Sequence, residues 1–513
     1  MQKMKQSACL CMVVYLTTAA GGAAWAESNL AAKEALIRAV KFFHQHVATH
    51  GGYVYQYSAD LSLREAEGIP ERHTIWVQPP GTPSVGAAML DAYQATGDAA
   101  CPAGALDAAR ALARGQLHSG GWDYSIRFGD STSAPFRRRD AQGNLTSDPI
   151  PVAERTAAGG WPLWRQRRFK LNVSTYDDDV TFAALRFLVR MDAALNFGDA
   201  EIHDAARYGL SALLGTQYPN GGWSTNFDRY PARPPDAAAF PVLRASFPSS
   251  WSRAWTKDFT GCYVTNDELM ARAMETLLLA SATYHEARFM EAARRAGRFL
   301  LDAQLPEPQP AWAQQYDVRM QPVWGRAFEP PAITSRESQN ILRALLSLHR
   351  ATGDAQYLAP VPRALAYLRR SLRPDGKLAR FYELKTNRPL YFTRGPGGQG
   401  HSLTYSDQKL ASNYGFIITP ELDDIEAEYR AALDGTPPTK VSPSAANSAA
   451  DVKRIIAALD ARGAWIEPGV IRNADGRKQE PPGGIIRSET FARHVRTLCR
   501  YLAATESVSN SRL

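Results

Sequence analysis

A helical hairpin that recurs along the chain is the feature that most constrains its fold. Each copy has an amphipathic helix beginning near the letters AAR, followed by a glutamine, a turn and an aromatic residue. Clear copies lie at 107–124, 204–225 and 291–312, with a weaker copy at 362–382 and an earlier relative ending at 50–58. The copies are spaced by roughly 55 to 100 residues, too irregularly for an open solenoid. Hairpins with inserted loops between them therefore predict a helical ring.

The residue pattern within the copies predicts an all-α fold. Apolar residues recur at helical spacing over 180–191, and alternating strand patterns are scarce. We expect an incomplete α/α toroid, in which helical hairpins form a ring and irregular loops line its cleft. The Gly-Gly pairs supply the positive φ angles that end a helix. The tryptophans that follow them, Trp122 and Trp223, either cover the end of the hairpin or stack on carbohydrate.

Composition divides the chain into four parts. Residues 1–26 hold two lysines, an apolar stretch and the letters AWA, which is the pattern of a cleaved signal peptide. A membrane anchor, the alternative, needs about 20 apolar residues. We expect the ring over 27–435, a Pro/Ser/Ala-rich linker over 436–450 and a C-terminal helical cap and tail over 451–513. The signal peptide predicts a secreted or periplasmic protein.

Charge and cysteine content narrow the class of protein. The formal net charge is +8, or +6 without the two lysines of the signal, which hold no opposing acids. A mildly basic exported protein suits an acidic extracellular partner such as a polyanionic polysaccharide or nucleic acid, or the charge is ordinary surface charge. Three of the five cysteines lie beyond the signal, an odd number that excludes a complete disulfide scaffold. The chain has no HExxH, G-x-S-x-G or phosphate-binding glycine loop. Basic residues are not interleaved on one helix, so no nucleic-acid partner is expected.

Two acidic segments open predicted helices: TYDDDVT at 175–181 and TNDEL at 265–269. The helix dipole favours each acid there by about 0.3–1 kcal/mol, and Thr175 is within reach of a capping role. Three consecutive carboxylates fan out around the helix axis and repel one another, so a compensating cation is the alternative. Helix ends on one face of a ring converge on its cleft, and carboxylate and amide oxygens are the ligands that Ca²⁺ prefers.

Two segments of opposite sign, 324–338 and 376–398, are rich in arginine. Guanidinium groups can clamp carboxylates in bidentate fashion, or these arginines are solvated or paired with the acids above. Within the first segment, residues 334–337 read as a structural capping box. The proline-rich stretch 226–260 reads as a long inserted loop near the cleft.

Several of these segments together resemble a known family. They are STYDDDVTFAALRFL, QYPNGGW, TNDELM, WAQQYD, GRAFEPPAITSRES and LARFYELKTNRPLYFTR. The set is similar to the pectic acid (pectate) lyases of the tenth polysaccharide lyase family, over about residues 40–420. The resemblance implies an α/α toroid that binds polygalacturonate and cleaves it by β-elimination with Ca²⁺.

The resemblance also implies roles for particular residues. Asp177 and Asp267 would bind Ca²⁺, and Arg326 would be the catalytic base. The implied substrate-binding residues are Arg380, Arg394, Asp178 and Asn266. A guanidinium pKa above about 12 keeps arginine protonated, so the base role rests on the resemblance alone.

This chain departs from the family pattern at three places. Asp178 stands where the family often has asparagine, the 226–260 insertion is long, and a glycine-rich segment at 395–408 replaces a shorter loop. Each departure leaves open a related uronic acid polymer or a modified pectic oligosaccharide as the substrate.

Other functions stay open as alternatives. A terpene or squalene-type cyclase shares the Gln…Gly…Trp turns, a toroid glycoside hydrolase would use Asp177 and Asp267 as acid and base, and a glycan-binding toroid would lack catalysis. For the lyase we expect an anionic polysaccharide as the partner, no membrane association and a monomer.

Overall fold

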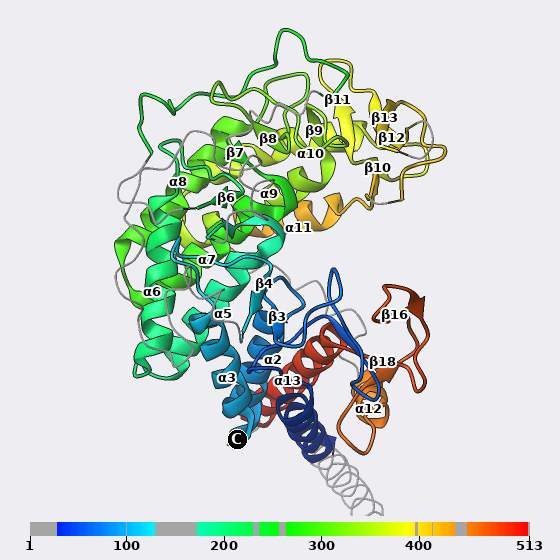
Figure 1. Ribbon diagram of the computed structural model, residues 1–513. Helices are drawn as coiled ribbons and strands as arrows, with labels where there is room; N and C mark the ends of the chain where they lie inside the picture. The colour runs from blue at the N-terminus through cyan, green and yellow to red at the C-terminus, as the bar shows by residue number, and fades with distance from the viewer. Residues whose placement is uncertain are drawn as a thin grey trace, which may run out of the picture. The chain divides into compact units, whose positions relative to one another are not determined.

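The computed structural model describes residues 28–98, 100–128, 172–228, 235–255, 263–395, 399–412, 414–436 and 449–510 (Figure 1). The expected signal peptide, 1–26, and most of the expected linker lie outside the described residues. The chain divides into two compact units. Unit 1 comprises 1–76, 80–111 and 442–513, and unit 2 comprises 77–79 and 112–441.

Unit 1 joins the beginning of the chain to its end. Helix α2 (Thr82–Thr96) packs against the C-terminal helix α13 (Ser488–Asn510). Its remaining elements are η1 (Phe43–Val47), β1 (Gln56–Ser58), β2 (Arg64–Glu65), β3 (Thr74–Trp76), α3 (Ala100–Arg114), α12 (Ala449–Ala457), β15 (Ile466–Glu467), β16 (Ile471–Arg472), β17 (Lys478–Gln479) and β18 (Ile485–Arg487). Four of these strands form an antiparallel sheet in the order β15-β18-β1-β2. The C-terminal helical pair therefore includes strands that the sequence pattern did not predict.

Unit 2 is built from helices with short strands at their ends. Its helices are α5 (Val180–Ala194), α6 (Ala200–Gly215), α7 (Leu269–Tyr284), α8 (Ala287–Ala303), α9 (Ser335–Thr352), α10 (Val361–Arg370) and α11 (Leu422–Leu433), with the 3₁₀ turns η4 (Asp177–Asp179), η5 (Asn266–Glu268) and η6 (Ala355–Leu358). Its strands are β4 (Ser125–Arg127), β5 (Ser174–Thr175), β6 (Asn226–Phe227), β7 (Tyr263–Val264), β8 (Gln315–Tyr316), β9 (Ala332–Thr334), β10 (Leu378–Ala379), β11 (Phe381–Glu383), β12 (Pro389–Arg394), β13 (His401–Thr404) and β14 (Ile417–Ile418).

The helices of unit 2 lie in two layers. Helix α5 packs against α7, α7 against α9 and α9 against α11, which makes one continuous row (Figure 1). Helices α6, α8 and α10 each pack on a member of this row. The row α5-α7-α9-α11 is the inner row, and α6, α8 and α10 form the outer row. Two such rows of helices are the arrangement of an α/α toroid, so the predicted all-α fold is confirmed. Among the described helices, none is long and apolar enough to cross a bilayer.

The recurring Gln…Trp turn is a structural lock for each hairpin. Trp223 is fully buried, and its Nε1 donates to the carbonyl of Leu213 at the end of α6. Gln217 Nε2 donates to the carbonyls of Gly221 and Ala292, which ties the turn to α8. The same tryptophan bond is made by Trp122 to Leu112, Trp312 to Leu300 and Trp465 to Ile455. These rings satisfy helix carbonyls within the core, so carbohydrate stacking by Trp122 and Trp223 is excluded.

The arginine-rich segment 376–398 contributes strands to a sheet, which its sequence pattern did not predict. Strands β11, β12 and β13 form an antiparallel sheet with β9 in the order β13-β12-β11-β9. Short strands of two to six residues carry too little alternation to stand out in the sequence. The capping box was also wrong. The hydroxyl of Thr334 donates to the carboxylate of Glu337 and caps no backbone N–H of α9.

Candidate active site

The two acidic segments have the same backbone conformation. Each forms one 3₁₀ turn before an inner helix, η4 before α5 and η5 before α7, and the two turns lie in contact. Asp178 and Asp179 have φ of 49° and 62°, and Asp267 and Glu268 have φ of 48° and 63°. The left-handed region costs roughly 1–2 kcal/mol for an L-residue other than glycine. Paired residues with positive φ at both turns are the kind of strain found at functional sites.

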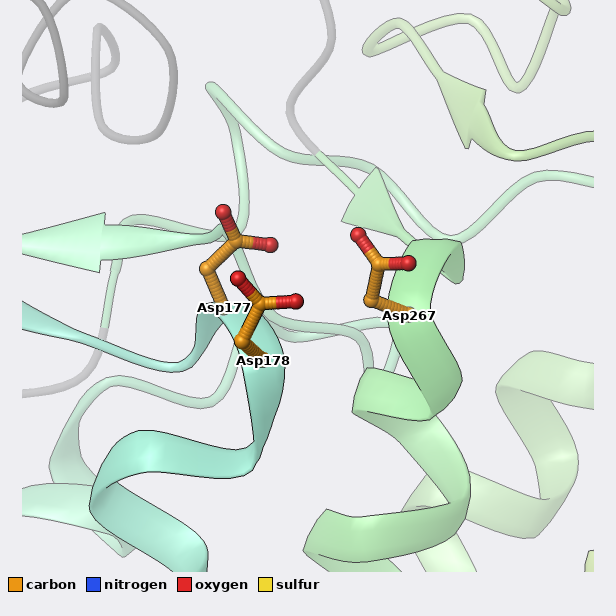
Figure 2. Close-up of side chains that lie close together, drawn as sticks. All are labelled: Asp177, Asp178 and Asp267. Atoms are coloured by element: carbon orange, nitrogen blue, oxygen red, sulfur yellow. The ribbon is translucent and has the colours of Figure 1, made fainter. Parts of the chain in front are cut away.

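The left-handed turns bring three carboxylates together. Asp177 and Asp178 from η4 and Asp267 from η5 each offer an oxygen, and these oxygens lie within 4.8 Å of one another (Figure 2). The hydroxyl of Tyr124 lies 3.0 Å from Asp177 Oδ2 and 3.1 Å from Asp178 Oδ2 and can donate to either. Thr175 Oγ1 accepts from the backbone N–H of Asp177 at 3.1 Å. The N-cap of η4 is Tyr176 and that of α5 is Asp179, so Thr175 is not the helix cap that the sequence suggested.

The third aspartate of the row points to different partners. Asp179 Oδ2 lies 2.6 Å from Arg186 Nη2 and 3.9 Å from Arg272 Nε. Arg272 also pairs with Glu268 at 2.6 Å, so this arginine bridges the two turns. Because Asp178 and Asp179 have positive φ, the three aspartates do not stand on the regular helix start that the sequence predicted. The positive φ angles separate a cation-paired carboxylate from two carboxylates that face Asp267.

Arg326 lies at the edge of the three-carboxylate cluster. Its Nη2 is 3.5 Å from Asp267 Oδ2, which is a long ion pair. Its stronger partner is the buried Glu329, whose Oε1 accepts from both Nε at 2.9 Å and Nη2 at 2.5 Å. The hydroxyl of Tyr414 donates to the same oxygen at 3.1 Å. The guanidinium is thus held in one orientation beside the cluster.

A buried polar network continues behind the cluster. Gln314 Nε2 lies 2.7 Å from Asn266 Oδ1, 3.0 Å from the Tyr414 hydroxyl and 3.3 Å from Glu337 Oε1. Asn266 in turn donates to Asp267 Oδ2 at 2.6 Å. Arg380 is 1% exposed and donates to Glu337 at 2.8 Å, with its guanidinium 4.1 Å from the centre of the Tyr414 ring. Through Asn266, this network holds the carboxylate of Asp267 in position.

Burial and mutual repulsion of the carboxylates change the pKa values of the residues in the cluster. Burial, with the neighbouring charge of Asp178, raises the pKa of Asp177 to about 6. Burial is the main cause that raises the pKa of Asp267 well above its usual range, and the negative charges of Asp177 and Asp178 add to it. Burial alone lowers the pKa of Arg326, but Glu329 and other anions outweigh it, so the pKa rises. Carboxylates outnumber the guanidinium here, and a bound cation would relieve the excess negative charge.

The chemistry of the cluster fits a divalent cation with oxygen ligands. Ca²⁺ binds oxygens at 2.3–2.6 Å, so opposite ligands around one ion lie about 4.6–5.2 Å apart, and the 4.8 Å span falls in this range. The described residues of the cluster offer no histidine or cysteine, which would favour a transition metal. Asp178 lies with the implied metal ligands Asp177 and Asp267, not only with the substrate-binding residues.

Sequence reasoning missed several residues of the site, namely Tyr124, Gln314, Glu329, Glu337 and Tyr414. Glu329 lay within the GRAFEPP motif, three residues after Arg326, so its spacing could have been noted. Tyr124 and Tyr414 are far from the acidic segments in sequence, and nothing local predicts their approach. Of the expected substrate-binding residues, Arg394 lies exposed at the end of β12, opposite His401.

Residues 153–371 match the model of the pectic acid lyase family. The resemblance seen in the sequence is confirmed over this stretch. The matched stretch contains both acidic turns, Arg326 and Glu329, and the match supports a polysaccharide lyase. A comparison with curated proteins finds no match to the chain.

Solved structures of carbohydrate-active enzymes are also similar to the chain. A family 10 polysaccharide lyase from Cellvibrio cellulosa is 18% identical, with 68% of this chain and 97% of that chain covered and a TM-score of 0.40. A mutant of that lyase in complex with trigalacturonic acid is 17% identical, with the same coverage and a TM-score of 0.39. A GH76 α-mannanase from Bacteroides thetaiotaomicron is 11% identical, with 94% of this chain and 97% of that chain covered and a TM-score of 0.39.

Proposed function

We propose that this protein is a secreted or periplasmic lyase that cleaves polygalacturonate, or a related uronic acid polymer, by Ca²⁺-dependent β-elimination. The observation that carries the proposal is the juxtaposition of Asp177, Asp178 and Asp267 with Arg326. Oxygen ligands for a divalent cation and a fixed guanidinium face one small space. An anionic sugar would be bound between them, and the family match over 153–371 supports this substrate class.

The chemistry needs a proton removed from the carbon next to a carboxylate. Ca²⁺ at Asp177, Asp178 and Asp267 would supply positive charge that neutralises the substrate carboxylate and the developing enolate-like anion. Arg326 is the proposed base. The carboxylates around it raise its pKa, so this role requires their charge to be offset. Asn266 would orient the substrate from η5, and the exposed Arg394 is a proposed contact for a uronate carboxylate. The buried Arg380 positions Glu337 in this conformation, and its contact with substrate stays a prediction.

The test is the ultraviolet absorbance of a 4,5-unsaturated uronate during digestion of polygalacturonate, with Ca²⁺ and then with a chelator. We expect absorbance that rises with Ca²⁺ and stops with chelator. For Arg326→Ala we expect a rate at least about a hundredfold lower, since a positioned proton acceptor contributes 10²–10⁴-fold. The control is Arg319→Ala, which removes a largely exposed arginine seven residues away that pairs with Asp317. A rate within tenfold of wild type for Arg326→Ala would exclude it as the base.

A glycoside hydrolase is the second candidate. The observation that favours it is the raised pKa of Asp177, about 6, which suits a general acid. Asp267 would then be the partner carboxylate, and no metal would be needed. New reducing ends without the unsaturated absorbance would identify hydrolysis and contradict the lyase proposal.

A further inference from the structure

The inserted segment 226–260 is attached to the segment that carries Arg326. Within its described part 235–255, which follows the described residues 226–228, Trp255 Nε1 donates to the carbonyl of Gly325 at 2.9 Å. In return, Trp324 Nε1 donates to the carbonyl of Ser252 at 2.7 Å. The Trp251 and Trp324 rings meet edge to face at 6.1 Å. Gly325 and Trp324 are the two residues before Arg326, so these two hydrogen bonds hold the insertion beside Arg326.

The opposite wall is the β12–β13 hairpin. Arg253 of the insertion pairs with the carboxylate of Glu383 and donates to the hydroxyl of Tyr405. Tyr405 donates to Glu383 at 2.9 Å, and Phe392 meets Trp324 edge to face at 6.2 Å. The described parts of two features in which the chain departs from the family pattern therefore contact each other, through Arg253 of the insertion and Tyr405 of the glycine-rich segment 395–408.

Between these walls lies a groove of about 740 Å³. This volume is within the ~300–1,000 Å³ of typical small-ligand sites. The residues that line it are mainly aromatic or small and polar, among them Trp255, Trp324, Phe392, His401, Ser402 and Tyr405. Aromatic surface with a few hydroxyl and imidazole groups suits the apolar face and hydroxyls of a pyranose ring.

The charge of the groove differs from that of the carboxylate cluster. Among the described lining residues, Arg253 is the one that is charged at every pH near neutral, and Glu383 already pairs with it. Two further guanidinium groups lie near the groove but are not among its lining residues: Arg388, 3.6 Å from the centre of the Tyr405 ring, and the exposed Arg394, opposite His401 on β13. They are placed to bind the carboxylates of neighbouring uronate units, whereas an uncharged ring would lose no ionic solvation on entering the groove itself.

We infer that this groove, formed by 251–255, 324–327 and the β12–β13 hairpin, is a subsite for an uncharged pyranose unit of the polysaccharide. The unit is a methyl-esterified uronate or a neutral sugar carried on the same chain. The inference rests on the proposed function, because it assigns the neighbouring subsite of that cleft. It gives the enzyme a preference for partly esterified or branched uronans over fully charged polygalacturonate.

The test compares kcat/KM on partly methyl-esterified galacturonan, on a uronan with neutral side-chain sugars, and on polygalacturonate. For Tyr405→Ala and His401→Ala we expect the ratio of kcat/KM on one uncharged-unit substrate to that on polygalacturonate to fall about tenfold. The substrate whose ratio falls distinguishes the ester from the neutral sugar. The control is Tyr429→Ala, a partly buried tyrosine of α11 that does not line the groove, for which the ratio stays at the wild-type value.

A binding measurement separates the groove from the reaction. Titration of wild type with methyl-esterified trigalacturonate should change tryptophan fluorescence, because Trp255 and Trp324 line the groove. Tyr405→Ala should weaken this response about tenfold. Equal responses of wild type and variant, or tighter binding of the free acid, would overturn the inference. A fluorescence response that is lost in the variant, with no unsaturated product from any uronan, would retain the groove and contradict the proposed lyase activity.

Discussion

Asp178 and Asp179 are adjacent and chemically identical, but their side chains have different partners. Asp178 faces Asp267 across the cluster, whereas Asp179 pairs with Arg186 and Arg272. The pattern DDD predicts negative charge near a helix start and nothing more. The direction of each side chain depends on two successive positive φ angles, which no local signal in the sequence specifies, although aspartate tolerates this region better than most residues.

Substitution of these two aspartates should therefore separate binding from stability. For Asp178→Asn we expect Ca²⁺ affinity, measured by calorimetric titration, to fall about tenfold, because the number of charged ligands sets affinity. For Asp179→Asn we expect Ca²⁺ affinity within about threefold of wild type but a lower free energy of unfolding, by roughly 1–3 kcal/mol, since Arg186 loses a largely buried partner. The reverse pattern would contradict the assignment of Asp178 to the cluster.

The raised pKa of Asp177 predicts a pH dependence with a definite sign. Its pKa in the native state, about 6, exceeds the unfolded value near 3.9. The native state then binds more protons between these values, so the contribution of Asp177 to stability is complete below pH 4 and is lost as pH rises through 6. Without divalent cations we expect Tm to fall from pH 5 to pH 7 in wild type more steeply than in Asp177→Asn.

Calcium should reverse this trend. Ionised carboxylates bind the cation and protonated ones do not, so the increase in Tm on adding Ca²⁺ should be larger at pH 7.5 than at pH 5. Parallel Tm curves for wild type and Asp177→Asn, with and without Ca²⁺, would contradict both the pKa assignment and the metal site.

At the scale of elements, the short turns η4 and η5 decide what the inner helices present to the cleft. Both begin at the start of an inner helix, and both contain two consecutive left-handed residues. The helices themselves were predictable from apolar periodicity. The turns and the two four-stranded sheets were not predictable, because elements of two to six residues leave no periodic signal.

The strain in these turns is testable at Glu268. Its φ of 63° costs an alanine roughly 1–2 kcal/mol and a glycine almost nothing, whereas glycine loses about 0.5–1 kcal/mol more backbone entropy on folding. Both substitutions remove the same ion pair with Arg272. We expect Glu268→Gly to be more stable than Glu268→Ala by roughly 0.5–1 kcal/mol in chemical denaturation, the opposite of the order in a helix interior. Equal or reversed stability would show that the turn is relaxed.

At the scale of the whole molecule, the candidate site lies within unit 2, and unit 1 contains both α2 and α13. A ligand that binds one folded unit stabilises that unit by mass action. In hydrogen-exchange measurements we expect Ca²⁺ to slow exchange in peptides that cover η4, η5 and the first turns of α5 and α7. Peptides of α2 and α13 serve as the internal control and should be unchanged. Protection confined to unit 1 would place the cation elsewhere.

The sequence by itself determined the helical class, the repeated hairpin with its Gln…Trp turn, and most of the charged residues of the site. These features are local: apolar periodicity sets the buried face of a helix, and a motif such as TNDEL keeps its letters in order. Only the tertiary structure decided that Asp178 joins Asp177 and Asp267, that Asp179 turns away, and that Glu329 and Tyr414 hold Arg326. Those outcomes depend on backbone angles and on contacts between segments far apart in the sequence, such as the ion pair of Arg326 with Asp267 and the hydrogen bond from Tyr414 to Glu329. Such contacts form only when the chain folds, so no single stretch of sequence predicts them.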